Sequence, residues 1–309
     1  MRRIIIDTDT ASDDAVAIMM ALAAPQVQVE ALTIVAGNVG LAQASINARH
    51  TLKICNAHVP VYDGCSVPLL KPASTAEWFH GEDGMGNQNY PLPVQTTEPQ
   101  HAVNALIERF RATPGEIELI TLGPLTNIAT ALSMEPELAN WVKRCTIMGG
   151  AAATLGNVTP AAEYNFWCDP EAARRVLHSG MPITLVGWEL SCGEATLSDA
   201  EIDSILSLGN ERASTAIECN RTALEAVRNL QGQTGLALAD PVAMAVALDP
   251  TIAIEKSHHY VDVETVSELT RGMSVVDINE VTGNPPNTEV CFAIDNARWK
   301  ALLLESLTD

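Results

Sequence analysis

Several features that would point to common protein classes are missing from this chain. Of its 309 residues, 38 are acidic and only 18 are Lys or Arg, so the formal net charge at pH 7 is −20. The basic residues form no cluster, which makes nucleic acids and anionic membranes poor partners for this protein. No segment reaches the roughly 18 consecutive apolar residues of a membrane-spanning helix. A small uncharged or cationic molecule is the ligand that such a chain admits most easily.

The seven cysteines form no recognisable motif. They are scattered, odd in number and never spaced as Cys-x-x-Cys, which argues against a disulfide framework and against a zinc site. Each is expected to be a small buried apolar residue. No signal peptide precedes the first predicted strand, so we expect a protein of the reducing cytoplasm.

Strand and helix patterns alternate as far as residue 190. Apolar runs predict strands over residues 4–6, 29–36, 59–63, 117–122, 145–148 and 182–186, with helices over 15–22, 41–56 and 101–112 and another that starts at 125–132. Such alternation predicts an α/β fold with a mostly parallel central sheet and helices on both faces. Five of these strands run into glycine, which predicts that several strand ends share one edge of the sheet.

The remaining segments differ in character. Residues 64–98 are irregular and rich in Pro and Gly, and a loop of that length is usually functional or disordered. Residues 198–231 have a polar helical pattern, and residues 258–292 have β-like patterns before a closing helix near residue 296. Neither a linker nor an internal repeat is visible. We therefore expect one domain over residues 1–309, with a C-terminal β addition.

The most informative segment is rich in aspartate and follows the first strand. Asp7, Asp9, Asp13 and Asp14 lie where a buried strand ends and a helix begins. Each alone would be an ordinary helix cap, but ligands bind at this edge of open α/β sheets. Four crowded carboxylates repel one another, so we predict a hard divalent cation among them. Asp13 and Asp14 diverge by about 100° around a helix, so one can face a cation and the other a second ligand.

A phosphatase is one alternative interpretation of this segment. Asp7-Thr8-Asp9-Thr10 loosely resembles the nucleophile motif of haloacid-dehalogenase-type phosphatases. That chemistry needs a later Lys to balance the phosphate charge, and no Lys follows the expected strand end. The net negative charge also disfavours phosphate esters. This interpretation is therefore the weaker one.

The spacing D-x-D-x-x-x-D-D from Asp7 to Asp14 resembles the signature of the inosine-uridine nucleoside hydrolases. The matches run in order as far as the helix that begins at Asp240, and the ordered set is specific although each segment alone is weak. The further matching segments are Ala36-Gly37-Asn38, His80-Gly81-Glu82-Asp83-Gly84, Gly123-Pro124-Leu125-Thr126-Asn127, Met148-Gly149-Gly150, the stretch from Glu163 to Ala172, and Asp240-Pro241.

The resemblance implies an enzyme that hydrolyses the N-glycosidic bond of ribonucleosides to a free base and ribose. It implies Ca²⁺ as cofactor, with Asp9 also serving as the general base that takes a proton from the attacking water. The implied calcium ligands are the carboxylates of Asp9, Asp14 and Asp240 and the backbone carbonyl of Leu122. Met148 would lie against the face of the ribose.

The same resemblance implies a set of polar contacts to the sugar. Asp13 and Asn165 would hold the ribose hydroxyls, and Asn157 and Glu163 would hold the 5′-hydroxyl. Asn38 would contribute to the sugar contacts. Neutral amides and a carboxylate together offer both donors and acceptors, which suits a ligand rich in hydroxyl groups. A homodimer or homotetramer is expected from the resemblance only.

The chain departs from the family pattern at Ala239, where family members carry a His that protonates the leaving base or a Trp that stacks on it. Ala can do neither. His80, in the long loop beside the expected site, is the remaining candidate for the proton donor. Trp188 and Trp78 are candidates to stack on the base. The departure also keeps open a binding protein for nucleosides or sugars that lacks catalysis, although such a protein has little use for Asp9.

Overall fold

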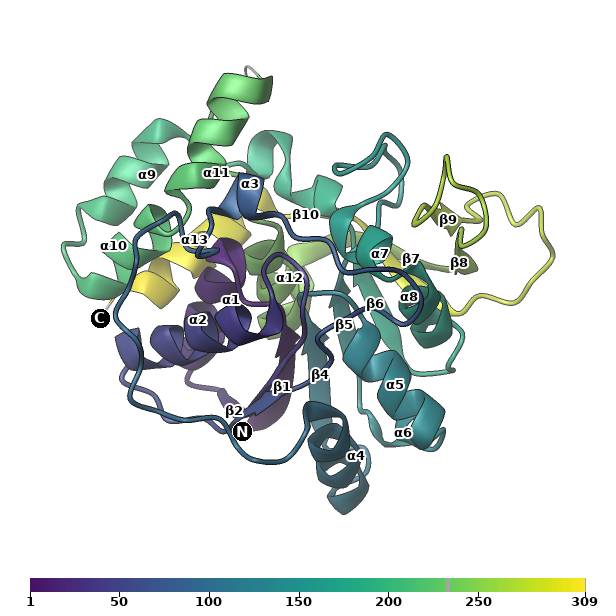
Figure 1. The fold of residues 1–309 in the computed structure, drawn as a ribbon. Coiled ribbons are helices and arrows are strands. Elements are labelled where there is room, and N and C mark those ends of the chain that lie inside the picture. Colours follow the sequence, from purple (N-terminus) through teal and green to yellow (C-terminus); the bar gives the residue numbers. More distant parts are fainter. Residues whose placement is uncertain (232–233, 309) are drawn as a thin grey trace.

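The main sheet has eight strands. Figure 1 shows this sheet at the centre of the molecule. In this computed structural model, which describes residues 1–231 and 234–308, the strand order is β3-β2-β1-β4-β5-β6-β10-β7. Neighbouring strands pair in parallel except β10 and β7, which are antiparallel. The predicted α/β fold with a mostly parallel sheet is confirmed.

The elements are bounded as follows. The strands of the large sheet are β1 (Arg2–Thr8), β2 (Val27–Ile34), β3 (Val61–Asp63), β4 (Ile117–Thr121), β5 (Cys145–Met148), β6 (Ile183–Val186), β7 (Ala253–His259) and β10 (Thr288–Ile294), and β8 (Val261–Val263) with β9 (Ser274–Val276) forms a separate pair. The α-helices are α1 (Ser12–Ala23), α2 (Leu41–Ile54), α3 (Glu77–His80), α4 (Ala102–Ala112), α5 (Thr126–Met134), α6 (Leu138–Trp141), α7 (Tyr164–Cys168), α8 (Pro170–Leu177), α9 (Asp199–Leu206), α10 (Glu211–Glu218), α11 (Arg221–Ala226), α12 (Ala239–Leu248) and α13 (Asn296–Leu307). Short helical turns are η1 (Trp188–Ser191), η2 (Gly193–Ala195), η3 (Val227–Gln231) and η4 (Pro250–Ile252).

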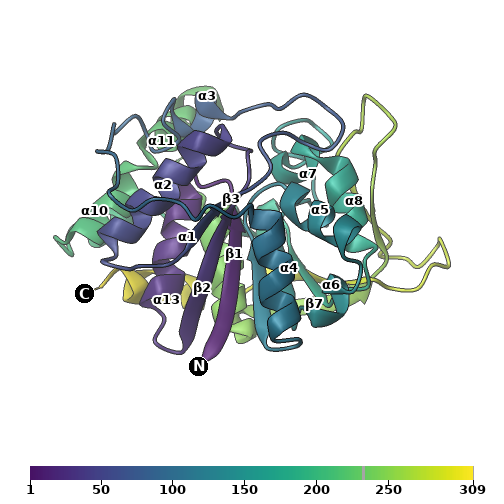
Figure 2. The same cartoon turned by 60° about the horizontal axis from the view of Figure 1, so that its bottom comes forward.

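Two apolar cores cover the two faces of the sheet. Side chains alternate along a strand, so Ile4 and Ile6 of β1 enter one core and Ile5 enters the other. The first core holds α1, α2, α12 and α13, and the second holds α4, α5 and α8. Figure 2 shows α1, α2 and α13 on one side of β1 and β2, with α4, α5 and α8 on the other. This two-sided burial explains why the strands are apolar without alternation.

Helices α1 and α12 are buried on nearly every side. In α1 every residue from Asp14 to Ala21 is buried, and in α12 every residue from Asp240 to Leu248 is buried. A helix that is apolar all round belongs in a core, and these two pack against each other. Their first turns therefore lie close together at the carboxyl ends of the strands, and both first turns carry aspartate.

The sequence predicts the C-terminal β region as an addition to the domain, but two of its strands belong to the main sheet. β10 pairs with β6 in parallel and with β7 in antiparallel, so these two strands extend the main sheet. Only β8 and β9 stand apart, at the right of Figure 1. β2 ends at Ile34, two residues before the predicted end, and residues 64–98 are irregular apart from α3 and a single isolated β-bridge, close to prediction.

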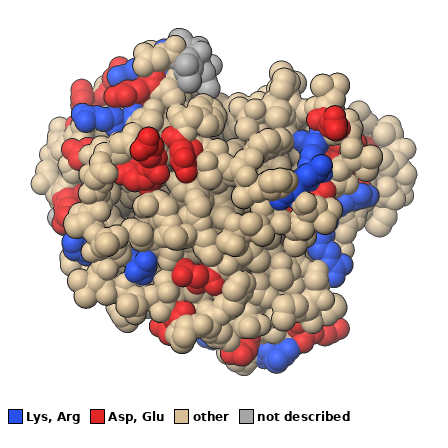
Figure 3. Space-filling model, in the orientation of Figure 1, with Lys and Arg blue, Asp and Glu red and all other residues tan. Residues whose placement is uncertain are grey.

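The distribution of surface charge and the length of the helices can be compared with the expectation that nucleic acids and anionic membranes are poor partners. On the face shown in Figure 3, basic side chains lie in small groups, and they cover no continuous area. Within the described part of the chain, no helix combines the length and the apolar character needed to cross a membrane.

A charged cluster ties the amino ends of the central strands together. Glu118 of β4 accepts hydrogen bonds from Arg2 of β1 at 2.6 and 3.2 Å and from Arg144 at 2.7 Å. Arg2 also donates to the carbonyls of Ala247 and Leu248 at the end of α12. Burial alone would raise the pKa of Glu118, but the hydrogen bond from Arg2 and the charge of Arg144 outweigh it and lower the pKa to about 2.

We expect Glu118→Gln to reduce the free energy of unfolding at pH 7 by about 1–3 kcal/mol, because hydrogen bonds to a charged group are lost. A carboxyl whose pKa is lowered by folding stabilises the fold above its unfolded pKa, and this stabilisation is lost as the pH falls toward the folded value of about 2. The difference between the two proteins should therefore shrink in acid. Urea unfolding over a pH series measures it.

Glu116→Gln is the matched control, because Glu116 pairs with Arg3 but its side chain is 62% exposed. Such exposed pairs contribute little. An equal loss in both variants, or a loss at Glu118 that does not change with pH, would contradict the role assigned to the cluster.

Candidate active site

A cavity opens at the carboxyl ends of the parallel strands. Its wall includes Asn38 beyond β2, Leu122 after β4, Met148 at the end of β5 and Trp188 after β6. These positions lie at or just beyond the strand ends that run into glycine in the sequence. These strand ends share one edge of the sheet, as predicted, and the cavity lies along that edge.

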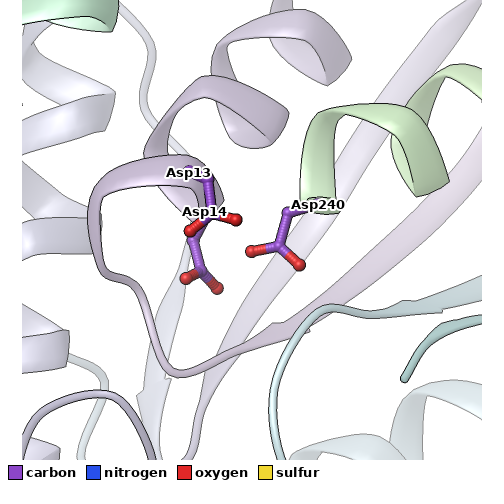
Figure 4. Close-up of side chains that lie close together, drawn as sticks. All are labelled: Asp13, Asp14 and Asp240. Carbon is purple, nitrogen blue, oxygen red and sulfur yellow. The ribbon is translucent and has the colours of Figure 1, made fainter. Parts of the chain in front are cut away.

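Three carboxylates meet beside this cavity. Asp13 and Asp14 come from the first turn of α1, and Asp240 comes from the first turn of α12. One oxygen from each lies within 4.8 Å of the others. Figure 4 shows the three side chains close together, two from α1 and one from α12. Asp14 is fully buried and accepts from Thr8 Oγ1 at 2.5 Å, whereas Asp13 is partly exposed to the cavity. Asp13 and Asp14 therefore differ in their exposure to the cavity, but an oxygen of each belongs to the same cluster.

Asp9 lies in the short connection between β1 and α1. Its Oδ2 accepts the backbone N–H of Asn38 at 2.5 Å. Its Oδ1 is buried and has no hydrogen-bond partner among the described residues. Asp9 is not one of the three most closely spaced carboxylates, but its charge acts on Asp240. The arrangement leaves one oxygen of Asp9 available for a ligand.

Two glycines make room for the Asp9 carboxylate. A Cβ atom at Gly37 would lie 2.1 Å from Asp9 Oδ2, and one at Gly123 would lie 2.6 Å from Oδ1. Real Cβ atoms do not approach an oxygen that closely. The glycines that follow β2 and β4 are thus required by the side chain at the end of β1, in addition to forming turns.

Burial and mutual repulsion dominate the electrostatics of the site. Burial, followed by the charge of Asp14, raises the pKa of Asp9 well above its usual range. Burial and then the charges of the neighbouring aspartates do the same to the pKa of Asp240, and burial with the charge of Asp13 raises the pKa of Asp14 to about 6. A positive ion would remove this penalty. The all-oxygen donor set and the open Oδ1 of Asp9 fit a hard divalent cation.

Polar groups line the opposite wall. Asn165 donates through Nδ2 to the carbonyl of Leu122 at 2.8 Å, which leaves its Oδ1 without a partner among the described residues. Glu163 caps α7 and accepts three backbone N–H groups, from Gly150, Asn165 and Phe166. Burial raises the pKa of Glu163 to about 7 against the effect of these donors. Asn157 accepts from the Tyr164 backbone through Oδ1, so its amide N–H₂ group is free to donate.

The remaining wall is aromatic. His80 at the end of α3 is buried, and its Nδ1 lies 2.8 Å from Ser12 Oγ. Burial lowers the pKa of His80, and the charge of Asp13 partly opposes this. The indole N–H of Trp188 donates to the carbonyl of Leu155. Trp78 is 59% exposed at the rim, and Ala239 lines the same cavity from the start of α12.

The structure gathers all twelve predicted site residues around this cavity, with Asp9 and Asp14 behind its wall. Asp7, the first aspartate of the motif, lies apart from these residues. Its carboxylate accepts hydrogen bonds from Thr33 and Asn127, and it does not line the cavity. Tyr164 was not predicted; it lines the cavity, and its hydroxyl donates to the carbonyl of Gly37 at 3.0 Å. Ser12 was not predicted either. Both lie in segments that match the family, but nothing in the sequence pattern indicates these long-range partners.

Comparisons with known proteins agree on one family. The family model described as inosine-uridine preferring nucleoside hydrolase matches residues 4–301. The chain is 37% identical over 308 residues to RihA, a pyrimidine-specific ribonucleoside hydrolase of Shewanella sp. (strain ANA-3), and the match covers 99% of this chain and 96% of the relative.

Solved structures give the same result. A plant nucleoside hydrolase, PpNRh1, superposes with a TM-score of 0.94 at 31% identity, and each chain is 99% covered. A purine-preferring ribonucleoside hydrolase from Gardnerella vaginalis superposes with a TM-score of 0.92 at 27% identity, covering 99% of this chain and 98% of that one.

We expect the aspartate cluster to bind a divalent cation and Gly37→Ala to weaken that binding about tenfold or more, because the added methyl group displaces the Asp9 carboxylate. Calorimetric titration with Ca²⁺ of the chelator-treated protein measures the affinity. Affinity should also fall as the pH drops through the raised pKa values, because protons compete for the carboxylates.

Gly40→Ala is the control, since a Cβ at Gly40 meets nothing within 4 Å. Equal affinities in the two glycine variants, or no cation uptake by the folded wild-type protein, would overturn this account of the site.

Proposed function

The chain belongs to the inosine-uridine preferring nucleoside hydrolase family and is a ribonucleoside hydrolase, and we propose that it works with Ca²⁺ held by Asp9, Asp14, Asp240 and the carbonyl of Leu122. The observation that carries the proposal is the convergence of buried aspartates at the edge of a cavity whose other wall is amide and carboxylate. The family is metal-dependent, and oxygen ligands of this kind suit calcium. When bound, the cation supplies positive charge that acidifies a water molecule and orients the ribose hydroxyls.

Asp9 is the proposed general base. Its Oδ2 is held by the Asn38 N–H, so the carboxylate cannot rotate freely, and its Oδ1 has no partner among the described residues. Oδ1 takes a proton from the attacking water. The water oxygen then bonds to C1′ of the ribose, while the bond from C1′ to the base nitrogen breaks and its electron pair leaves with the base.

The polar wall holds the sugar in the proposal. Asp13 and the free Oδ1 of Asn165 accept hydrogen bonds from the ribose hydroxyls, and Asn38 adds to these contacts. Asn157 and Glu163 hold the 5′-hydroxyl, the first through its free amide N–H₂ group. The surrounding carboxylates favour the positive charge that develops on the ring as the glycosidic bond breaks.

Met148 and Trp188 provide the apolar contacts of the substrate. Met148 at the end of β5 lies against the face of the ribose, and its sulfur accepts from the Asn165 amide at 3.2 Å. The indole of Trp188 is fixed by its bond to the carbonyl of Leu155 and lies against the base.

His80 is the proposed proton donor to the leaving base. Ala239 has no proton to give, and the Tyr164 hydroxyl is committed to the carbonyl of Gly37. His80 is the only histidine among the described residues that line the cavity, and its Nε2 makes no hydrogen bond within that part of the chain. A base that accepts this proton leaves as a neutral molecule, which lowers the barrier to bond cleavage.

The rival function is a nucleoside- or sugar-binding protein without catalysis. A binding protein that kept the cation would still use Asp9 as a ligand, but it would have no use for Asp9 as a base, so ribose release separates the two functions. The base preference is left open between purines and pyrimidines, because the sequence relative is named pyrimidine-specific and one structural relative purine-preferring. A cytoplasmic homodimer or homotetramer remains an expectation from the family resemblance.

The first test is ribose release from inosine, adenosine, guanosine, uridine and cytidine, with and without a calcium chelator. Asp9→Asn should reduce kcat by about 10²–10⁴-fold, as expected when a general base is removed. Chelation should abolish release, and added Ca²⁺ should restore it. Asp203→Asn, an exposed change on α9, should leave activity unaltered.

The hydrolase proposal fails if folded, calcium-loaded protein releases no ribose from any of the five nucleosides. Measurable nucleoside affinity in that case would support the binding protein. Full activity of Asp9→Asn would instead remove the assigned base.

A second test addresses the leaving group. His80→Ala should lower kcat for nucleosides by about 10²–10⁴-fold, because a general acid is lost. It should have little effect on 4-nitrophenyl β-D-ribofuranoside, whose leaving group departs without protonation. His58→Ala, at an exposed position, is the control. Equal losses on both substrates would show that His80 is not the acid.

A further inference from the structure

Within the described residues the Ser12 hydroxyl makes one hydrogen bond, and its partner is His80. Ser12 Oγ lies 2.8 Å from His80 Nδ1, and no other hydrogen bond of this hydroxyl occurs within the described residues. The nearest acidic atom, Asp13 Oδ1, is 4.0 Å from Nδ1 and therefore beyond hydrogen-bond distance. Ser12 is 0% exposed, so water does not compete for this contact.

Capping of α1 does not account for this serine. Serine near a helix start usually caps the helix by accepting a backbone N–H. Here the residue before the helix is Ala11, and the carboxylate of Asp14 accepts the Ala11 N–H at 3.0 Å. The hydroxyl of Ser12 accepts no backbone N–H in the described structure. Among the described residues, the imidazole is the hydrogen-bond partner that accounts for a hydroxyl at this fully buried position.

Both ends of the contact are fixed by their backbones. The Ser12 carbonyl accepts from the thiol of Cys219 and from the amide of Asn220, on the segment that packs beside α1. His80 donates its N–H to Ala76 and accepts from Gly86 through its carbonyl. With both backbones held, the hydrogen bond between the side chains determines the orientation of the imidazole ring.

We propose that Ser12 is the positioning residue of the leaving-group acid: it holds His80 Nδ1 so that Nε2 faces the base end of the cavity. This inference rests on the proposed function. Burial favours the neutral imidazole and the charge of Asp13 opposes this, so the ring has to take up a second proton from solvent before the step. In the reaction this doubly protonated ring gives the proton on Nε2 to the leaving nitrogen and becomes neutral. The proton on Nδ1 stays on the ring, and Ser12 Oγ accepts a hydrogen bond from this N–H before and after the transfer. The ring therefore keeps its orientation throughout the step.

Removal of the hydroxyl leaves Nδ1 buried without a partner. The closest alternative acceptor is Asp13, and a ring that turns toward it carries Nε2 away from the base. Asp13 is also a proposed ligand of the ribose, so such a contact would compete with substrate. The hydroxyl thus keeps the acid and the sugar ligand apart.

The test compares Ser12→Ala with wild type on two substrate types. On the best nucleoside of the panel, kcat should fall about 10- to 100-fold, a part of what a general acid contributes, with KM changed less than about twofold. On 4-nitrophenyl β-D-ribofuranoside, both parameters should stay within about twofold of wild type. The double variant Ser12→Ala/His80→Ala should be no slower than His80→Ala, because both changes remove one function.

Ser45→Ala is the matched control, since Ser45 is a buried serine of α2 whose hydroxyl has no partner in the described structure. Neither substrate should distinguish this variant from wild type. Ser12→Cys, which keeps a weak acceptor of similar size, should lie between Ser12→Ala and wild type on nucleosides.

A spectroscopic measurement makes the inference independent of turnover. In protein labelled with ¹⁵N-histidine, the Nδ1 resonance of His80 should shift in Ser12→Ala and stay in place in Ser45→Ala. An unmoved resonance overturns the inference whatever the activity.

Three kinetic results would also overturn it: unchanged nucleoside hydrolysis by Ser12→Ala, equal losses on both substrates, or a loss that adds to that of His80→Ala. Equal losses would mean that the nearby carboxylate cluster had been damaged instead. None of these results touches the proposed function, which fails separately if wild-type protein releases no ribose or if Asp9→Asn is fully active.

Discussion

Mutual repulsion among Asp9, Asp14 and Asp240 is the constraint on which the rest of the structure depends. Each carboxylate is buried, and burial together with the charges of neighbouring aspartates raises its pKa. The fold tolerates this because α1 and α12, which carry two of the three, are buried along almost their whole length in the first apolar core. A bound cation would lower the free energy of the folded state further, which couples metal binding to stability.

The geometry of the strand ends follows from the same constraint. The carboxylate of Asp9 occupies space that a side chain at residue 37 or 123 would fill, so both neighbouring strands must run into glycine there. The backbone freed by these glycines comes close enough for the Asn38 N–H to bond Asp9 and for the Gly37 carbonyl to accept from Tyr164. One side chain at the end of β1 thereby determines the residue types at two other strands.

Much of this could be predicted from the sequence, and what could not has a physical reason. The apolar run before Asp7 and the aspartates after it identify the sheet edge, because periodicity and spacing are local properties. The contact between Ser12 and His80 spans 68 residues and follows no period. The position of β10 beside β6 could not be predicted from the sequence either. The C-terminal strands have the same pattern of apolar residues whether they extend the sheet or form a separate layer. Asp7 resembles its neighbours in sequence, yet its bonds to Thr33 and Asn127 turn it away from the cavity.

The two ends of the cavity are under unequal constraint. At the carboxylate end Asp9, Asp14 and Asp240 are buried close enough to act on one another's charge, so a change at one of them alters the pKa of the others. At the base end Ala239 on α12 and His80 on α3 line the cavity from different elements, and no bond links them within the described residues. The proposed proton donor therefore comes from α3, whereas the family pattern has its donor on α12 at the position of Ala239. The imidazole of His80 is instead held by Ser12, at the start of the helix that carries Asp13 and Asp14, so the first turn of α1 contacts both ends of the cavity. A change at Ala239 does not reach this contact, because Ala239 lies on another helix.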